Sequence, residues 1–273
     1  MTPLDGQVAL ITGGARGIGR GIALAFAEAG ADIAIAEVDR LPSASQQYGE
    51  AQIGGFAGAQ QTVREITKLG RRAVAIQADV SRKTETLRMV EDTIRQLGGL
   101  DILVCNAGVV SLSPVETMSE ESWDIAMAVN AKGVFLSCQA AIPHLKRKGT
   151  GCIINIASVA GKNGAPGMAH YCASKFAVVG FTNALAKELA PDNIRVNAIC
   201  PGILRTQMWE YLADNMKQPG EPKEDAWNRF VQMAIPLRRP QTPADIGRLA
   251  VYLATAENVT GQAINVDGGM EMH

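Results

Sequence analysis

The sequence lacks the long hydrophobic runs that mark membrane and secreted proteins. No apolar stretch approaches the roughly 20 uncharged residues that span a bilayer. Residues 1–6 contain no basic region followed by an apolar core, so they do not match a signal peptide. These absences predict a cytoplasmic protein with no membrane partner.

The chain also has almost no net charge and little cysteine or histidine. Lys and Arg number 26 against 27 Asp and Glu, a formal charge of -1, which gives no electrostatic basis for binding nucleic acid. The five cysteines are odd in number and lie mostly in apolar segments, as expected of reduced core residues. Neither His144 nor His170 has the Cys/His spacing of a zinc site. We therefore expect no metal, and partners that are small molecules or copies of the chain.

What is present is an alternation of strand-like and helical segments. A length of 273 residues suits one large domain covering 1–273. The strands are expected to be apolar throughout and separated by helices, the pattern of a parallel sheet covered on both faces. We predict an α/β, doubly wound, seven-stranded and mostly parallel sheet flanked by helices. The expected strands are 8–11, 32–36, 73–77, 100–105, 152–156, 195–199 and 263–266.

Two segments break this alternation. Residues 41–60 are rich in Ser, Gln and Gly without a sustained period, which predicts a loop inserted after the second strand. Residues 203–235 mix short amphipathic helices with a turn at 218–222. This second segment follows a strand on the carboxyl side of the sheet, where a substrate lid would lie.

A glycine-rich turn follows the first strand and opens a helical pattern. Residues 12–19 read Thr-Gly-Gly-Ala-Arg-Gly-Ile-Gly. Glycines at such a turn let the backbone approach a pyrophosphate, and the helix N-terminus supplies N–H donors and partial positive charge. The pattern predicts a dinucleotide site of the Rossmann type. Its expected contacts are Gly13, Arg16, Gly17, Ile18 and Gly19.

Glu37 ends the next strand, eighteen positions beyond Gly19. That spacing places a carboxylate where it can accept from the adenine-ribose hydroxyls. A carboxylate would repel the extra phosphate of NADP, so NAD is the expected cofactor. Arg16 keeps NADP as the second candidate, because a basic side chain in the turn could reach a 2'-phosphate.

Two later strands also end in residues suited to the cofactor. Asp79 and Val80 close one, and Asn106, Ala107 and Gly108 close another. These positions fit an adenine contact and a close backbone approach, although each alone is an ordinary strand-end turn.

Tyr171 and Lys175 lie one helical turn apart, and Ser158 precedes them. A tyrosine with a free pKa near ~10 is a poor base at neutral pH. A lysine on the same helical face favours the phenolate, and a nearby hydroxyl can bind the same substrate oxygen. The set predicts proton transfer to or from an alcohol oxygen.

Taken together, these motifs resemble the short-chain dehydrogenase/reductase family in its compact form, over nearly the whole chain. The usual double Asn before Ala-Gly is here Cys105-Asn106, which leaves the contacting Asn in place. The matching motifs are the turn at 12–19, Asn-Ala-Gly at 106–108, Asn130, Ser158, Tyr-x-x-x-Lys at 171–175, Pro201-Gly202 with Thr206, and Asp-Gly-Gly at 267–269.

The resemblance implies a role for each site residue. Tyr171 would be the acid/base, Lys175 would lower its pKa and hold the nicotinamide ribose, and Ser158 would orient the substrate oxygen. Asn130 would support a water leading to Lys175. The carboxamide end of the nicotinamide would contact Pro201, Gly202 and Thr206, the last of which could also be a helix N-cap.

The segment after Thr206 bears on the substrate. Gln207-Met208-Trp209 resembles the substrate loop of family members that act on small diols, acetoin and polyols. Met168, Met208 and Trp209 would line an apolar pocket, with His170 as an extra polar contact beside Ser158 and Tyr171. A small neutral secondary alcohol or ketone, such as a diol, polyol or cyclic alcohol, fits this lining.

Other functions stay open at this point. The same Tyr/Lys pair can serve a sugar-nucleotide epimerase or dehydratase with retained NAD, and a non-catalytic dinucleotide-binding sensor would share the glycine turn. The insertion at 41–60 is either a surface loop near the adenine or a device that retains the nicotinamide. Compact family members commonly form tetramers, here expected to involve the helix at 123–142, the helix beginning at Tyr171 and the last strand.

Overall fold

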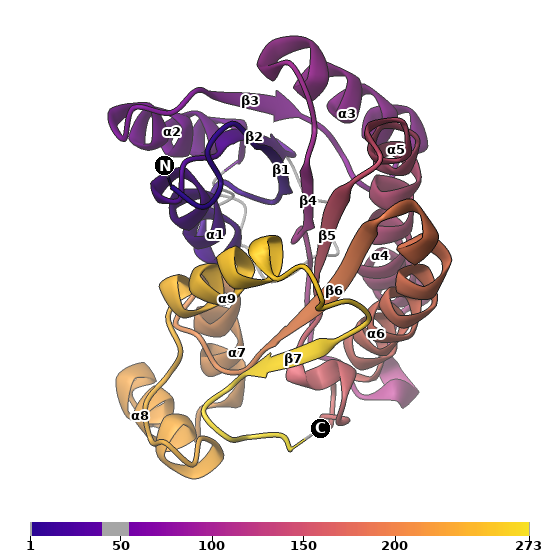
Figure 1. The fold of residues 1–273 in the computed structure, drawn as a ribbon. Helices are drawn as coiled ribbons and strands as arrows, with labels where there is room; N and C mark the ends of the chain where they lie inside the picture. Colours follow the sequence, from indigo (N-terminus) through magenta and orange to yellow (C-terminus); the bar gives the residue numbers. More distant parts are fainter. Residues whose placement is uncertain (1, 40–54, 273) are drawn as a thin grey trace.

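Seven parallel strands form one central sheet in the computed structural model, which describes residues 2–39 and 55–272 (Figure 1). The strand order is β3-β2-β1-β4-β5-β6-β7, and every neighbouring pair is parallel. The chain therefore winds outward in both directions from β1 and β4, and their carboxyl ends border the crevice where such folds bind ligands. The strands are β1 (Val8–Thr12), β2 (Asp32–Glu37), β3 (Ala73–Gln77), β4 (Ile102–Cys105), β5 (Gly151–Ile156), β6 (Ile194–Pro201) and β7 (Ala263–Val266).

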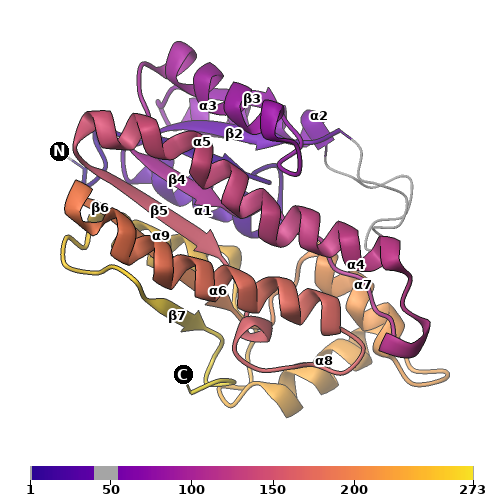
Figure 2. The ribbon, with the colours of Figure 1, turned by 90° about the vertical axis from the view of Figure 1, so that its right-hand side faces the viewer.

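Helices cover both faces of this sheet, as predicted. One layer holds α1 (Gly17–Glu28), α2 (Gly55–Lys68) and α9 (Pro243–Thr255). The opposite layer holds α3 (Lys83–Leu97), α5 (Gly133–Lys148) and α6 (Ala169–Leu189), the last two running side by side in Figure 2. The remaining segments are η1 (Val115–Thr117), α4 (Glu120–Ala126), the π-helical η2 (Met127–Lys132), η3 (Val159–Gly161), η4 (Ala190–Asp192), α7 (Gln207–Met216) and α8 (Lys223–Ala234).

The core has one apolar layer on each side of the sheet. In β1, Val8 and Leu10 pack into the cluster that contains Met89 of α3. Ala9 and Ile11 point the other way, into a cluster with α1 and α9. Side chains alternate across a strand, so a sheet covered on both faces needs apolar residues at most positions. This requirement explains the predominantly apolar strands of the sequence.

One helical run is long and strongly apolar. Glu120–Lys148 is 29 residues long and apolar enough to cross a membrane, yet 56% of its apolar window is buried inside the protein. Its last part, α5, packs against α3, β4 and β5. A core helix that covers a sheet meets the same criteria of length and composition. The run therefore gives only weak support for a membrane span.

The loop predicted at 41–60 is wrong at its carboxyl end, and residues 41–54 lie outside the described part of the chain. From Gly55 onward the chain is helical. Ala59, Thr62 and Ile66 of α2 are buried at spacings of three and four, a helical period that the glycine-rich composition obscured. Asp39 supports the start of α2 by accepting a hydrogen bond of 3.1 Å from the Phe56 N–H.

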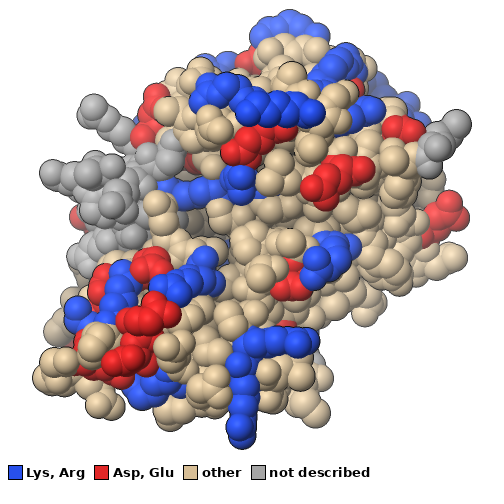
Figure 3. Space-filling model, turned by 90° about the vertical axis from the view of Figure 1, so that its left-hand side faces the viewer, with Lys and Arg blue, Asp and Glu red and all other residues tan. Residues whose placement is uncertain are grey.

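The mixed segment at 203–235 contains two helices, α7 and α8, as its composition predicted. Ion pairs join them: Lys223 lies 2.8 Å from both Glu210 and Asp214, and Arg205 pairs with Glu210 and Glu224. Figure 3 shows acidic and basic side chains gathered at the lower left of that face, over these helices. We call residues 203–235 the lid segment.

Candidate active site

The glycine turn is held open by close backbone packing. Gly13 has a φ of +68°, and a Cβ placed there would lie 2.9 Å from the Cα of Ala107. A Cβ at Gly19 would collide with the Gly13 carbonyl oxygen. Both positions therefore require glycine, one for its left-handed φ and both for lack of space.

Asn106 clamps this turn to the end of β4. Its Nδ2 donates to the carbonyl oxygens of Gly13 and Thr12, at 2.8 and 3.0 Å. The Thr12 hydroxyl in turn accepts from the N–H groups of Asn106 and Ala107, at 3.0 and 3.1 Å. The polar groups at the two strand ends satisfy one another, so the backbone of the turn has a fixed shape before any ligand arrives.

The turn fits a dinucleotide pyrophosphate. Among the residues that the structure describes, no side chain caps the N-terminus of α1, and its first turn contains no acidic residue. Gly13, Arg16, Gly17 and Ile18 line a cavity of about 690 Å³. A helix N-terminus with uncapped N–H groups and a glycine cradle is a ready site for phosphate oxygens.

Glu37 stands beside that cradle at the carboxyl end of β2. One carboxylate oxygen accepts from the Ala15 N–H and the other from the Val38 N–H, each at 3.2 Å. Burial raises the pKa of Glu37, while those two N–H groups and the charge of Arg16 oppose the rise. Glu37 and Arg16 both line the cavity.

Further along the cavity wall lie the other strand ends predicted from the sequence. Asp79 accepts from the N–H and the hydroxyl of Ser81, at 2.9 and 2.7 Å, which fixes its carboxylate. Thr206 begins α7 without a side-chain cap among the described residues, and its Cγ2 would lie 3.5 Å from a Cβ at Gly17. The lining also includes Val80, Asn106, Ala107, Gly108, Pro201 and Gly202.

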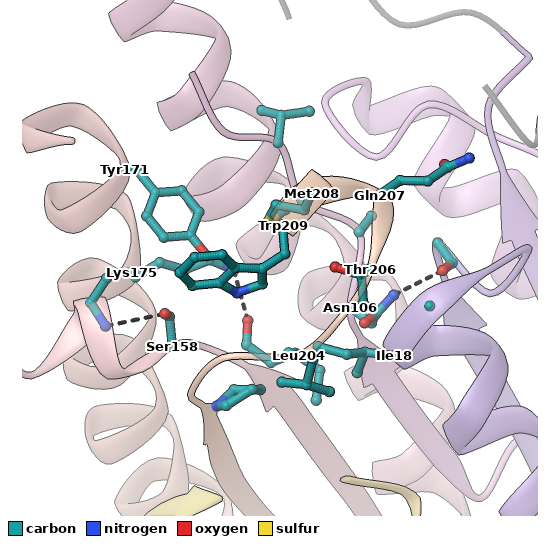
Figure 4. Close-up of a pocket in the computed structure, with 18 of the residues that line it drawn as sticks. Ile18, Asn106, Ser158, Tyr171, Lys175, Leu204, Thr206, Gln207, Met208 and Trp209 are labelled. Carbon is teal, nitrogen blue, oxygen red and sulfur yellow. Dashed lines mark hydrogen bonds between the residues drawn. The ribbon is translucent and has the colours of Figure 1, made fainter. Parts of the chain in front are cut away.

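The proposed catalytic residues meet at the same cavity. Ser158 follows β5 and its Oγ accepts from the Ala160 N–H at 3.1 Å. Tyr171 and Lys175 lie on α6, with Nζ 5.7 Å from the centre of the phenol ring. Nζ donates to the Ile156 carbonyl at 2.9 Å. In Figure 4 these three side chains lie on one side of the cavity, opposite Ile18, Asn106 and Thr206.

The lid segment supplies the remaining wall. Met208 and Trp209 of α7 and Met168 before α6 line the cavity. The Trp209 indole lies in front of Tyr171 and Ser158 in Figure 4. Its ring centre is 6.1 Å from that of Trp227 and 6.2 Å from that of Phe230, both on α8. The contact with Trp227 is edge-on and the contact with Phe230 is tilted, and both fix the indole against the second lid helix.

Comparison with known proteins decides the family. Residues 7–217 match the short chain dehydrogenase family. The chain belongs to the short-chain dehydrogenase family. The family and the fold predicted from the sequence are thus confirmed.

Relatives of this short-chain dehydrogenase span nearly its whole length. It is 38% identical to the 3-oxoacyl-(acyl-carrier-protein) reductase FabG of Staphylococcus aureus (strain Mu50), over 97% of this chain and 98% of the relative. It is also 38% identical to the L-2,3-butanediol dehydrogenase of Corynebacterium glutamicum, with the same two coverages. The crystal structure of a short-chain type dehydrogenase/reductase from Mycobacterium marinum gives a TM-score of 0.85 at 37% identity, covering 99% of this chain and 97% of that one.

Membership of the short-chain dehydrogenase family establishes the reaction class. The protein is an oxidoreductase that transfers a hydride to or from a nicotinamide dinucleotide. The cradle around Gly13 and Gly19 fits such a cofactor, since Gly13, Gly17 and Ile18 line the cavity that Tyr171 borders.

Asn130 belongs to a buried chain of hydrogen bonds that ends at the backbone of this dehydrogenase's tyrosine. Its Oδ1 accepts from the Val109 N–H at 2.8 Å, and its Nδ2 donates to the Val109 carbonyl and the Ser174 hydroxyl, at 2.9 and 3.0 Å. Ser174 donates to the Tyr171 carbonyl at 2.7 Å. Asn130 and Lys175 both border Gly108. A Cβ placed at Gly108 would lie 3.3 Å from Asn130 Oδ1 and 3.6 Å from Lys175 Nζ. The water that Asn130 would support stays a prediction.

Sequence reasoning missed two members of these networks, Thr12 and Ser174. Both lie inside quoted motifs, but a hydroxyl in an apolar strand or a helix gives no signal until its partners are known. Thr12 is 1% exposed and Ser174 is 0% exposed. Buried hydroxyls in native proteins are hydrogen-bonded, so a serine or threonine beside a catalytic or glycine motif is the only clue available.

His170 does not take the position predicted for it. The side chain is fully buried, and it is not among the described residues that line the cavity. Its Nε2 lies 2.7 Å from the Ser111 hydroxyl, and burial lowers the pKa of His170. Because it immediately precedes Tyr171 on a helix, its side chain must point about 100° away from the phenol. His170 thus ties α6 to the loop after β4.

Replacing Ser174 with Ala should destabilise the enzyme by about 1 to 3 kcal/mol, because Asn130 Nδ2 and the Tyr171 carbonyl each lose a buried partner. Chemical unfolding measures the change. Ser137→Ala is a matched control: its hydroxyl is similarly buried and, within the described residues, bonds the Gly133 carbonyl of its own helix alone. An equal loss of stability in both variants would contradict the role given to the chain of hydrogen bonds through Ser174.

The burial of Lys175 should make the free energy of unfolding depend on pH. Burial lowers its pKa from 10.5 to about 8, with Cys200 weakly opposing. A folded-state pKa below the unfolded value means that the buried ammonium is a penalty below about pH 8, and that this penalty fades as the pH rises toward 10.5. Over that window the cofactor-free enzyme should gain up to ~3 kcal/mol relative to Lys175→Met. Unfolding of both proteins across the window checks this, and parallel curves would reject it.

Proposed function

We propose that this enzyme transfers a hydride between NAD(H) and a small neutral secondary alcohol or ketone, of the diol, polyol or cyclic alcohol type. The observation that carries the proposal is the character of the cavity beyond Tyr171. Its wall there is apolar, with Ala160, Met168, Met208 and Leu212 packed near the phenol. Such a lining favours a substrate without charge.

The charged residues in the half of the cavity beyond Tyr171 also favour an uncharged substrate. Among the described lining residues beyond the catalytic set and the cofactor cradle, Arg205 is the charged one. Its guanidinium pairs with Glu224 and Glu210 and lies over the Trp227 ring, 5.6 Å from its centre. A carboxylate or phosphate on the substrate would have to compete with two protein carboxylates for this cation.

NAD is favoured over NADP by Glu37. Its carboxylate lies at the end of β2, where the adenine ribose sits in folds of this type, and it is fixed by two backbone N–H groups. A ribose hydroxyl can donate to it, whereas a 2'-phosphate would meet like charge. Arg16 is nearby, and its charge lowers the pKa of Glu37 against the larger effect of burial.

The chain's own residues account for the proton transfer. A bound nicotinamide supplies the hydride acceptor or donor. Tyr171 takes the hydroxyl proton in oxidation and returns it in reduction, with Lys175 favouring the phenolate. Ser158 Oγ accepts from Ala160, so its own proton can bind the substrate oxygen. Asn130 and Ser174 hold the backbone of the tyrosine in place.

The Staphylococcus relative suggests reduction of a carrier-bound 3-oxoacyl thioester as the second candidate. The lid segment offers little to such a partner, because it contains four basic and five acidic residues. Lys223 and Arg229 are each paired with carboxylates, as is Arg205. A phosphate-linked carrier arm would need unpaired cations at this entrance.

Nicotinamide absorbance tests the proposal directly. The protein is incubated with NAD or NADP and a panel of acyclic diols, polyols, cyclic alcohols and hydroxy acids, and with NADH or NADPH and an acetoacetyl thioester. Turnover of a neutral alcohol class with NAD is expected. A preference for the thioester supports the second candidate. Silence across the panel with NADH still bound points to a retained cofactor, as in an epimerase.

We also propose a cytoplasmic homotetramer. Trp123 of α4, Phe135 of α5 and Phe176 of α6 are 42%, 43% and 47% exposed on one helical layer. Aromatic residues are enriched at interfaces between subunits. Light scattering that gives the mass of a single chain would contradict this assembly.

A further inference from the structure

Four methionines from three separate segments converge on the substrate end of the cavity. Met168 precedes α6, Met208 and Met216 belong to α7, and Met270 lies in the tail after β7. The chain has ten methionines, so nearly half of them border this one space. None of the four is buried in the structure, and Met216 is 40% exposed. Each therefore has apolar surface that a ligand could cover.

The methionines belong to a continuous apolar wall. Met168 and Met208 pack against the cluster of Tyr171, Ala160 and Leu212. A second cluster, formed by Ile203, Trp227, Val231 and Ile235, packs against Ala234 and Met270. Trp209 contacts both clusters and joins them. The wall thus extends from the catalytic phenol to the tail of the chain.

The catalytic end of this half of the cavity is polar, and elsewhere Gln207 and the ion-paired Arg205 also line it. Ser158, Tyr171 and Lys175 lie together beside Trp209 in Figure 4. Farther out, the described lining residues Met216, Phe230, Ala234 and Met270 bring no polar side-chain group. A substrate that placed hydroxyls along this wall would leave them without partners, at a free-energy cost for each.

We propose that the preferred substrate is a neutral secondary alcohol or ketone with an extended apolar arm, which lies along the wall from Tyr171 toward Met270. This inference rests on the proposed function and narrows its substrate class: the neutral secondary alcohol or ketone is kept, and polyols are disfavoured. Unbranched, polarizable methionine side chains adapt to arms of different shape, so the enzyme accepts a range of them. Affinity comes from covering the partly exposed thioethers and Trp209.

A homologous series measures the arm. We would determine kcat/KM at saturating NAD for 2-alkanols from 2-butanol to 2-decanol, with hydroxy acids of equal length for comparison. Each methylene that is buried should raise kcat/KM roughly three- to fourfold until the wall is covered. The hydroxy acids should be poorer at every length. A flat or falling series would overturn the inference.

Two pairs of variants locate the arm. Met208→Glu and Met270→Glu each place a charge on the wall, and Met208→Leu and Met270→Leu keep its volume and polarity. The readout is the ratio of kcat/KM for 2-octanol to that for 2-butanol, so a general loss of activity cancels. The Glu variants should lower this ratio by tenfold or more, and the Leu variants should stay within about twofold. Equal ratios in all four variants would show that no arm lies there.

The test separates this inference from the proposed function. Turnover of 2-butanol and of small diols with a flat chain-length series removes the apolar arm and leaves the alcohol dehydrogenase. Failure of every alcohol and ketone with either cofactor removes both. A rising series with NADP in place of NAD keeps the arm and rejects the cofactor assignment.

Discussion

Tyr171→Phe should lower turnover by about 10²- to 10⁴-fold, the usual contribution of a general acid or base. The substitution removes only the phenolic oxygen, and the ring can keep its packing against Ala160 and Leu212. Folding and the affinity for NADH should therefore survive. Steady-state kinetics with the alcohol identified by the panel, together with NADH fluorescence titration, measures both properties.

Tyr252→Phe provides the control for this prediction. Tyr252 is 54% exposed on α9, on the layer opposite α6. Losing that hydroxyl should leave turnover unchanged. Retained activity in Tyr171→Phe would reject the acid/base assignment, and lost NADH binding would show that the variant had damaged the site.

Glu37→Ala should cost roughly 10- to 100-fold in kcat/KM for NAD, as expected for losing hydrogen bonds to a charged acceptor. The same change removes the repulsion of a 2'-phosphate, so kcat/KM for NADP should rise. The measured quantity is the ratio of the two values. It should move toward NADP even if overall activity falls.

Glu37→Gln separates charge from structure. The carboxylate also accepts from Ala15 and Val38, and its loss could loosen the glycine turn for both cofactors. Glutamine keeps one acceptor oxygen without the charge, so it should gain NADP activity while the turn keeps more of its support. A wild-type ratio in both variants would reject the ribose role of Glu37.

The layered fold could be predicted because its cause is local. A strand covered on both faces must be apolar at most positions, as in β1 and β4, and this is visible in the sequence. The helical residues 55–60 escaped prediction because glycine and alanine give a weak period, and only packing of Ala59 against the core shows the helix. A glycine-rich composition does not by itself exclude a helix.

In the site too, arrangements set by residues close together in the sequence could be predicted, and those set by distant residues could not. Tyr171 and Lys175 are four residues apart, so helix geometry alone brings them together. His170 was misplaced because its direction depends on Ser111, which is 59 residues away in the chain. The role of Ser174 was missed because it depends on Asn130, 44 residues away.

The sequence by itself determined the fold and the glycine turn and predicted the residues that would move the proton, because these rest on periodicity and on spacings of a few residues along the chain. The tertiary structure alone decided which hydroxyls hold the tyrosine, where His170 points and how far the apolar wall extends. Those features arise where β4, α6, the lid segment and the tail meet. Contacts between elements distant in the chain follow from packing the whole domain, which no local pattern encodes.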